Sequence, residues 1–136
     1  MPNHVTNKLV ITGPKKDLDA FKATMNRPNE HGEVCEFNFH QTVPQPTNII
    51  KGDIAFGDSR PNWLNWNIPN WGTKWNCYDV ENVIFTSRSI KITFLTAWSA
   101  PDKWLEKVSD QFPNLTFRNT WKDEGGPKGV DLYPAH

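Results

Sequence analysis

The sequence predicts an α+β domain in which two helices cover one face of an antiparallel sheet. Two observations lead to this fold class. Apolar residues alternate with polar ones in several short stretches, and they recur with a helical period in two longer ones. The stretches follow the order strand, helix, strand, strand, helix, strand once an insertion at about residues 27–79 is set aside. This is the split βαβ, or ferredoxin-like, arrangement, and 136 residues suffice for a single domain of this kind.

The first strand and the first helix are the clearest elements of the N-terminal part. A strand is expected at Val5–Thr12, where Leu9 and Ile11 point to one side and their neighbours to the other. Pro14 then suits the start of a helix over residues 15–26. Its apolar face is formed by Leu18, Phe21 and Met25.

The middle of the chain is irregular and rich in tryptophan. The segment CEFNFHQTV, residues 35–43, is expected to form a short strand that PQPTN then breaks. A helix is expected to begin at Pro61 and to end or kink at Pro69, which has no backbone N–H. Gly72 suits a left-handed residue that closes the last turn. We expect this insertion to pack against an edge of the sheet or to cover part of its open face.

The C-terminal part completes the sheet. NVIFTSRSIKITFLTA predicts two strands around a Ser-Arg-Ser turn, and SAPDKWLEKVSDQF predicts a helix with Ser99 as its cap. Asp102 suits the positive end of that helix. LTFRNTW alternates again, and VDLY is expected to add a short terminal strand. The apolar stripe of the helix comprises Leu105, Val108 and Phe112, with Trp104 beside it.

Composition excludes several classes of protein. Fifteen basic and fifteen acidic residues balance, which argues against a general nucleic-acid binder but permits a local basic patch. The N-terminus does not resemble a signal peptide, and no apolar run is long enough to span a bilayer. Cys35 and Cys77 are too few to hold an iron–sulfur cluster, and the acidic residues show no metal-ligand spacing. We therefore expect a cytoplasmic protein without cofactor, metal or membrane contact.

Three stretches resemble one known family along the whole chain, in the same order. They are MPNHVTNKLVITGP, NWGTKWNCYDV and FLTAWSAPDKWLEKVSDQFPNLTF, and FNFHQTVPQP is also similar to a segment of that family. The family comprises uncharacterised bacteriophage and plasmid proteins, the Api-like proteins with a ferredoxin-like domain. The resemblance implies this fold and a mobile-element origin in bacteria, and it implies no activity. The chain departs from the family pattern in its short residues 27–62 and at Pro69, where the family continues a helix.

The tryptophan-rich segment has two interpretations. As a binding surface, its indoles and one lysine would stack nucleic-acid bases, hold a ligand ring or form the hot spot of a protein interface. As structure, the same indoles would complete a small hydrophobic core. We interpret NWGTKW mainly as structural, with one or two side chains reaching outward. The candidate binding residues are Trp63, Trp66, Trp71, Lys74 and Trp75.

Two further motifs predict other activities. HVT at His4 and HQT at His40 resemble the paired motifs of two-histidine phosphoesterases, in which two imidazoles act as acid and base on one phosphate. Each motif specifies only two positions, so it is weak evidence for an enzyme.

RNA binding is another possibility for this fold. Some ferredoxin-like sheets bind RNA through exposed aromatic residues, and Phe94 and Phe117 are the candidates for such contacts in this sequence. The RNA-recognition signature is absent, however, and a solvated charged face is the simpler interpretation.

From these observations we expect a small non-enzymatic protein of a phage or another mobile element, acting in the bacterial cytoplasm. It would bind a host or defence protein by docking the tryptophan-rich surface on it and occluding it. Inhibition of a host nuclease or a CRISPR complex fits this origin and size. Two alternatives stay open: a single-stranded nucleic-acid-binding module, and a two-histidine phosphoesterase that acts on cyclic nucleotides. The sequence leaves the oligomeric state open.

Overall fold

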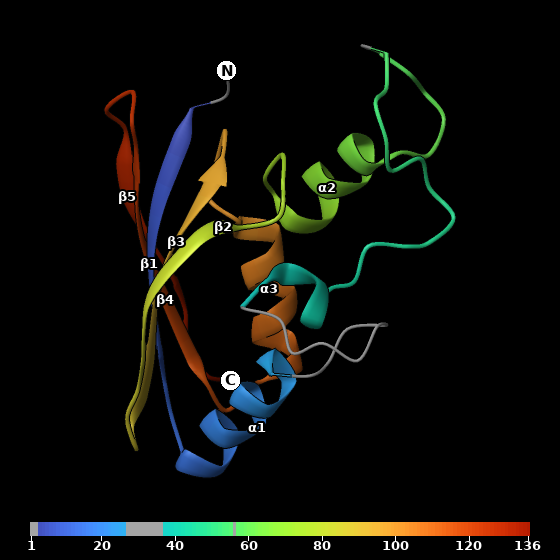
Figure 1. The fold of residues 1–136 in the computed structure, drawn as a ribbon. Coiled ribbons are helices and arrows are strands. Elements are labelled where there is room, and N and C mark those ends of the chain that lie inside the picture. Colours follow the sequence, from blue (N-terminus) through green and yellow to red (C-terminus); the bar gives the residue numbers. More distant parts are fainter. Residues whose placement is uncertain (1–2, 27–36, 56) are drawn as a thin grey trace.

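The protein folds as one antiparallel sheet with a layer of helices on one of its faces (Figure 1). The computed structural model describes residues 3–26, 37–55 and 57–136. Its strands lie in the order β2-β3-β1-β4-β5. They are β1 (His4–Thr12), β2 (Tyr78–Phe85), β3 (Ser89–Ala97), β4 (Thr116–Asp123) and β5 (Lys128–Tyr133). The helices are α1 (Lys15–Met25), a short 3-10 helix η1 (Phe39–Gln41), α2 (Trp63–Trp71) and α3 (Asp102–Gln111).

The predicted ferredoxin-like arrangement is confirmed. β1 lies in the middle of the sheet and pairs with β3 on one side and β4 on the other, both antiparallel. α1 connects β1 to the insertion, and α3 connects β3 to β4. The terminal segment VDLY extends into a fifth strand, which pairs with β4 and adds an edge to the four-strand arrangement.

The hydrophobic core lies between the sheet and the helices. Alternation along β1 buries Leu9 and Ile11, which face the buried side chains Ile90 and Ile92 of β3. Phe94 and Phe117 project into the same layer and are fully buried. The two candidates for stacking on RNA are therefore excluded from that role, because both rings are buried beneath the helices. No helix of the described residues covers the opposite face of the sheet (Figure 1).

The insertion joins the helical layer rather than the edge or the open face of the sheet, so that expectation is wrong. α2 packs against α3, on the same side of the sheet as α1 (Figure 1). The predicted strand over residues 35–43 is also wrong for its described part, residues 37–43, because Asn38 and Gln41 form a capping box around η1. Cys35 lies outside the described residues. This turn buries Phe39, which a strand would not place in the helical layer.

α2 passes through Pro69 and ends at Trp71, so Pro69 does not end the helix; the alternative, that Pro69 kinks it, stays a prediction. The helix begins two residues after Pro61, where Asn62 caps it with bonds from the N–H groups of Leu64 and Asn65. Pro69 lacks the N–H that would bond the carbonyl four residues before it, and the helix therefore loses a single intrahelical bond there. The prediction for Gly72 is confirmed, since it caps the C-terminus with a left-handed φ of 82°.

Ser99 does not cap α3, which is another correction. The N-cap is Pro101, and it makes no side-chain capping bond. The hydroxyl of Ser99 instead donates a hydrogen bond to the carbonyl of Gly72. An added Cβ at Gly72 would lie 1.9 Å from Oδ1 of Asp102, so the end of α2 and the start of α3 are in close contact. Asp102 lies in the first turn of α3, as predicted.

Candidate functional site

The run NWGTKW is divided between the core and the surface. Trp71 is only 1% exposed, and its ring packs edge-on against Phe39 and Trp66. Its indole N–H donates to the carbonyl of Val43 at 3.0 Å. Since Trp71 is inaccessible to a partner, it belongs to the core, and we remove it from the candidate binding residues.

Trp63 and Trp66 also have structural roles in α2. Trp66 is partly buried against the hydrophobic core. Trp63 uses its indole N–H to hold the preceding loop, donating to the carbonyl of Gly52 at 2.9 Å. Within the described residues, their ring contacts and side-chain hydrogen bonds join them to the insertion and not to the exposed end of the run at Lys74 and Trp75.

Lys74 and Trp75 form an exposed site together with a residue that the sequence did not single out, Trp98. The Lys74 ammonium lies 4.7 Å from the centroid of each of the two indole rings. Trp75 is 36% exposed and Trp98 is 47% exposed. A cation between two indoles is held by the electrostatic attraction of both rings. In the sequence, Trp98 could have been found from its position in the stretch TAWS, directly after the predicted strand.

Two further side chains extend this site toward the open face of the sheet. The ring of Tyr78 contacts Trp75 edge-on at 6.1 Å between centroids and His4 at 5.6 Å. The Tyr78 hydroxyl and Nδ1 of His4 are also hydrogen-bonded. Burial raises the pKa of the Tyr78 hydroxyl, and the negative charges of Asp79 and Glu124 add to this effect. We call these residues the aromatic cluster: His4, Lys74, Trp75, Tyr78 and Trp98.

Backbone contacts hold the two halves of the aromatic cluster together. The start of β1, the end of β3 and the loop between α2 and β2 meet at one end of the sheet (Figure 1). The Ala97 carbonyl accepts bonds from the Thr73 hydroxyl at 2.6 Å and from the Lys74 N–H at 3.2 Å. The N–H of Trp98 donates to the carbonyl of Asn3 at 2.9 Å. The positions of both tryptophans are thus set by the end of β3 and by Asn3, the residue before β1.

Trp98 has a strained backbone. Its φ is +77°, in the left-handed region that L-residues with a large side chain rarely adopt. Such a conformation costs on the order of 1–3 kcal/mol and persists only where the surroundings enforce it. Because the Trp98 side chain is exposed, this strain is not offset by burial of the indole. The left-handed conformation places the large apolar ring of Trp98 on the surface next to Lys74.

A buried chain of polar side chains supports the turn that carries Trp98. The Asn119 amide donates to Oδ1 of Asn7 at 3.0 Å, and the Asn7 amide donates to Oγ1 of Thr96 at 2.9 Å. The Thr96 hydroxyl in turn donates to the carbonyl of Ser99 at 2.7 Å. These bonds cross the three central strands inside the core and end beside Trp98. They fix the chain where it leaves β3.

The two histidines predicted for acid–base catalysis lie in different layers of the molecule. His4 is on β1, on the side of the sheet opposite the buried Val5, and contacts Tyr78. His40 is on η1 in the helical layer, where its ring packs edge-on against Trp71 and its Nδ1 accepts from the Gln45 N–H at 3.2 Å. Burial of the ring lowers the pKa of His40, and the nearby charge of Lys51 lowers it further. The sheet separates their side chains, so no single phosphate can contact both.

The acidic residues do not build a metal site in the described part of the chain, where no group of three possible ligands occurs. Glu124 accepts from the N–H of His4, and Asp123 accepts from the Asn3 amide at 3.2 Å. Both carboxylates therefore fix the N-terminal end of β1. No helix of the described residues has the length and apolar character needed to cross a membrane.

Comparisons with known proteins bear on the fold. Residues 70–135 match the family model of the ferredoxin-like domain in Api92-like protein. No curated protein matches the chain. The chain is similar in structure to the crystal structure of a protein api92 from Yersinia pseudotuberculosis, with a TM-score of 0.70 and 10% sequence identity. The similarity covers 99% of this chain and 95% of the other, so it extends through the insertion.

Proposed function

We propose that the protein is a non-enzymatic binding protein that docks its aromatic cluster on a partner protein. The observation that carries this proposal is the exposed arrangement of Lys74 between Trp75 and Trp98. Tryptophan is enriched among the few residues that dominate the energy of protein interfaces. A partner that covers both rings would bury a large apolar area and would also exclude water from the cation between them.

Rigidity of the site supports the same proposal. Trp98 sits on a turn held by the Thr96 hydroxyl, and Lys74 is bonded to the end of β3 through its backbone. Side chains that are already fixed lose little conformational entropy on binding, which favours affinity. This surface differs from the one expected from the sequence. It includes Trp98, Tyr78 and His4, and it does not include Trp63, Trp66 or Trp71.

The proposed partner is a bacterial host or defence protein. This part of the proposal rests on the resemblance to phage and plasmid proteins, which also suggests occlusion of a nuclease or a CRISPR complex as the mechanism. The two-histidine phosphoesterase is not proposed, since His4 and His40 share no neighbour.

The test is a tagged pull-down from bacterial lysate at physiological salt, with mass spectrometry of the bound proteins. The wild type is expected to retain one protein in stoichiometric amount, and Trp98→Ser should lose it. Trp63→Ser is the matched control, because it removes a tryptophan of α2 that lies outside the aromatic cluster. The proposal is wrong if the wild type retains no specific protein, or if Trp98→Ser retains it as well as the control does.

A further inference from the structure

The open face of the sheet carries a charge pattern that the balanced composition conceals. Exposed basic side chains lie on this face on each of the four strands from β3 to β5, and on β1, β3 and β4 they stand between buried residues of the opposite face. The only acidic residues on these strands, Asp123 and Asp131, belong to the other face, where they line a groove with Asp102. We call the exposed basic residues of the open face the basic face: Lys8, Lys91, Arg118, Lys122 and Lys128.

None of the five residues is neutralised within the described part of the chain. The ion pairs there involve other basic residues, namely Lys15, Arg60, Lys103 and His136. Lys122 and Lys128 are even direct cross-strand partners on β4 and β5. Like charges placed opposite each other destabilise a sheet. The chain therefore keeps an unfavourable pair on this face, which an anionic ligand would relieve.

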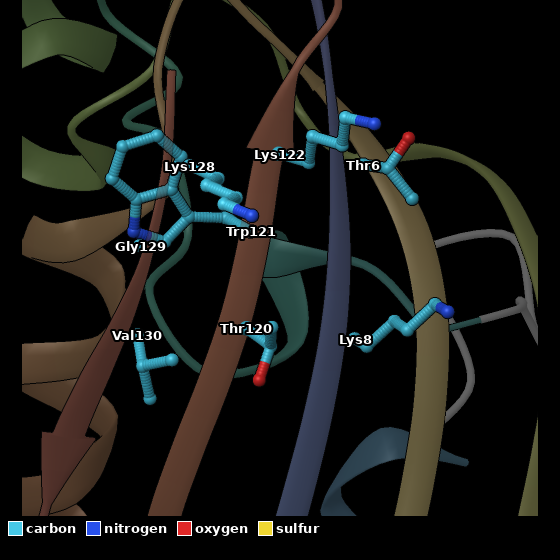
Figure 2. A pocket seen from close by; sticks show the side chains of 8 residues that line it. All are labelled: Thr6, Lys8, Thr120, Trp121, Lys122, Lys128, Gly129 and Val130. Atoms are coloured by element: carbon cyan, nitrogen blue, oxygen red, sulfur yellow. The ribbon is translucent and has the colours of Figure 1, made fainter. Parts of the chain in front are cut away.

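The basic face also contains a groove of about 540 Å³. Figure 2 shows the side chains of Thr6, Lys8 and Lys122 projecting from neighbouring strands at this groove. The register places Thr6 opposite Lys122 and Lys8 opposite Thr120, so hydroxyls and ammonium groups alternate across the two strands. Lysine ammonium and threonine hydroxyl groups are both common donors to phosphate oxygens. Val130 and the Trp121 side chain complete the lining with apolar surface.

We propose that the basic face binds the phosphate backbone of a single nucleic-acid strand. We expect the ligand to be anionic, because five cations lie on the strands from β3 to β5, whereas the acidic residues Asp79 and Glu81 of this face lie on the edge strand β2, where they line a separate groove. An extended acidic peptide fits less well, since the backbone N–H and C=O groups of the strands are already paired within the sheet. A peptide lying across this face would gain no backbone hydrogen bonds from the paired strands beneath it. A nucleic-acid strand needs only the cations and hydroxyls that are present, and its sugars would cover the apolar floor.

The arrangement predicts binding that is governed by charge and indifferent to base sequence. Among the described residues, aromatic side chains border this face at Trp121, which lines the groove, and at Tyr78 on the edge, so base stacking would come from these two positions. Affinity should then fall steeply with salt, by roughly 0.7 log units per phosphate contact for each log unit of salt. This surface and the aromatic cluster are separate sites, and their functions can be tested separately.

The test measures the anisotropy of a fluorescein-labelled oligothymidylate titrated with the full chain over a series of salt concentrations. The combined variant Lys8→Gln, Lys122→Gln and Lys128→Gln should bind more than about tenfold more weakly at low salt, and the salt slope should fall by about two units. The control variant Lys15→Gln, Lys16→Gln and Lys103→Gln removes the same charge from exposed positions of α1 and α3. It should bind like the wild type.

Three results would overturn the proposal. The first is no binding by the wild type at low salt, and the second is equal loss in both triple variants, which would indicate a general charge effect. The third is displacement of the oligonucleotide by an equal charge concentration of polyglutamate, which would assign the face to an acidic protein instead. Trp98→Ser should leave oligonucleotide binding unchanged, so failure here and failure of the proposed protein interaction are distinguishable. Circular dichroism would establish that each variant is folded.

Discussion

The indole of Trp104 stacks on the ring of Phe39 with 4.7 Å between the centroids. The contact joins α3, which belongs to the ferredoxin-like arrangement itself, to the insertion. The Trp104 N–H also donates a hydrogen bond to Thr42 Oγ1 at 2.8 Å. Both aromatic rings are fully buried. The described part of the insertion is therefore part of the core rather than an appendage, and its loss would uncover the rings of Trp104 and Phe94 that Phe39 contacts.

The division of NWGTKW between core and surface predicts different effects on stability. Trp71→Ala should lower the free energy of unfolding by about 3–5 kcal/mol, because it opens a cavity between η1 and the other helices. Trp75→Ala should cost clearly less, since more than a third of that side chain is exposed. Urea denaturation of both variants measures the difference. Equal losses would contradict the surface position of Trp75.

The strained backbone of Trp98 makes a prediction that does not depend on its side chain. Trp98→Gly and Trp98→Ala both remove the indole, but only glycine adopts a φ of +77° without steric cost. The glycine variant should therefore unfold with a free energy about 1 kcal/mol higher than the alanine variant. The same pair of substitutions at Thr93, which is on an ordinary strand, should show the opposite order. Chemical denaturation of the four variants measures whether glycine or alanine gives the higher free energy of unfolding at each position.

Periodicity along the chain predicted the sheet and the two long helices, because their buried faces are set by local alternation. Leu9 and Ile11, or Leu18 and Phe21, are buried as their spacing indicates. The insertion was different, since η1 depends on the capping pair Asn38 and Gln41 and on contacts far along the chain.

The candidate site was predicted only in part for the same reason. Lys74 and Trp75 were identified from composition, but the ring that faces them comes from the turn after β3. That turn adopts its conformation through a local bond from Thr96 and through bonds to Gly72 and Asn3, which are distant in sequence. The basic face was missed because its five cations are spread over four strands. They are brought together only by the register of the sheet.

The lowered pKa of His40 predicts that stability falls in weak acid. Burial disfavours the charged imidazole in the folded state, and Lys51 adds to this effect. Below the ordinary pKa of 6.5 the unfolded chain then binds more protons than the folded one. The contribution of His40 is fully present above that pKa and is lost as the pH falls toward the lowered value. The effect is small, because the residue remains partly exposed.

Denaturation at pH values of about 5 and 8 measures this contribution. His40→Gln should lose less stability between the two pH values than the wild type does. His136→Gln is the control, because that histidine is exposed at the C-terminus near Asp110. If His40→Gln shows the same pH dependence as the wild type, the imidazole does not titrate in the way described.

The buried polar chain predicts a coupling between Asn7 and Asn119, which are both fully buried. Asn7→Leu leaves the Asn119 amide without its acceptor, and an unpaired buried polar group costs about 1–3 kcal/mol. The double variant Asn7→Leu and Asn119→Leu removes both partners, so it should be more stable than the sum of the single losses predicts.

A double-mutant cycle measured by urea denaturation gives this coupling, and strict additivity would show that the bond between the two amides contributes nothing.

The buried series of polar side chains ends at the turn that carries Trp98. Thr96→Val therefore tests whether these bonds matter for binding as well as for stability. That substitution removes the hydroxyl that holds the Ser99 carbonyl and keeps the shape of the side chain. We expect it to weaken capture of a partner by the aromatic cluster while oligonucleotide binding by the basic face stays unchanged, because only the cluster depends on the conformation of this turn.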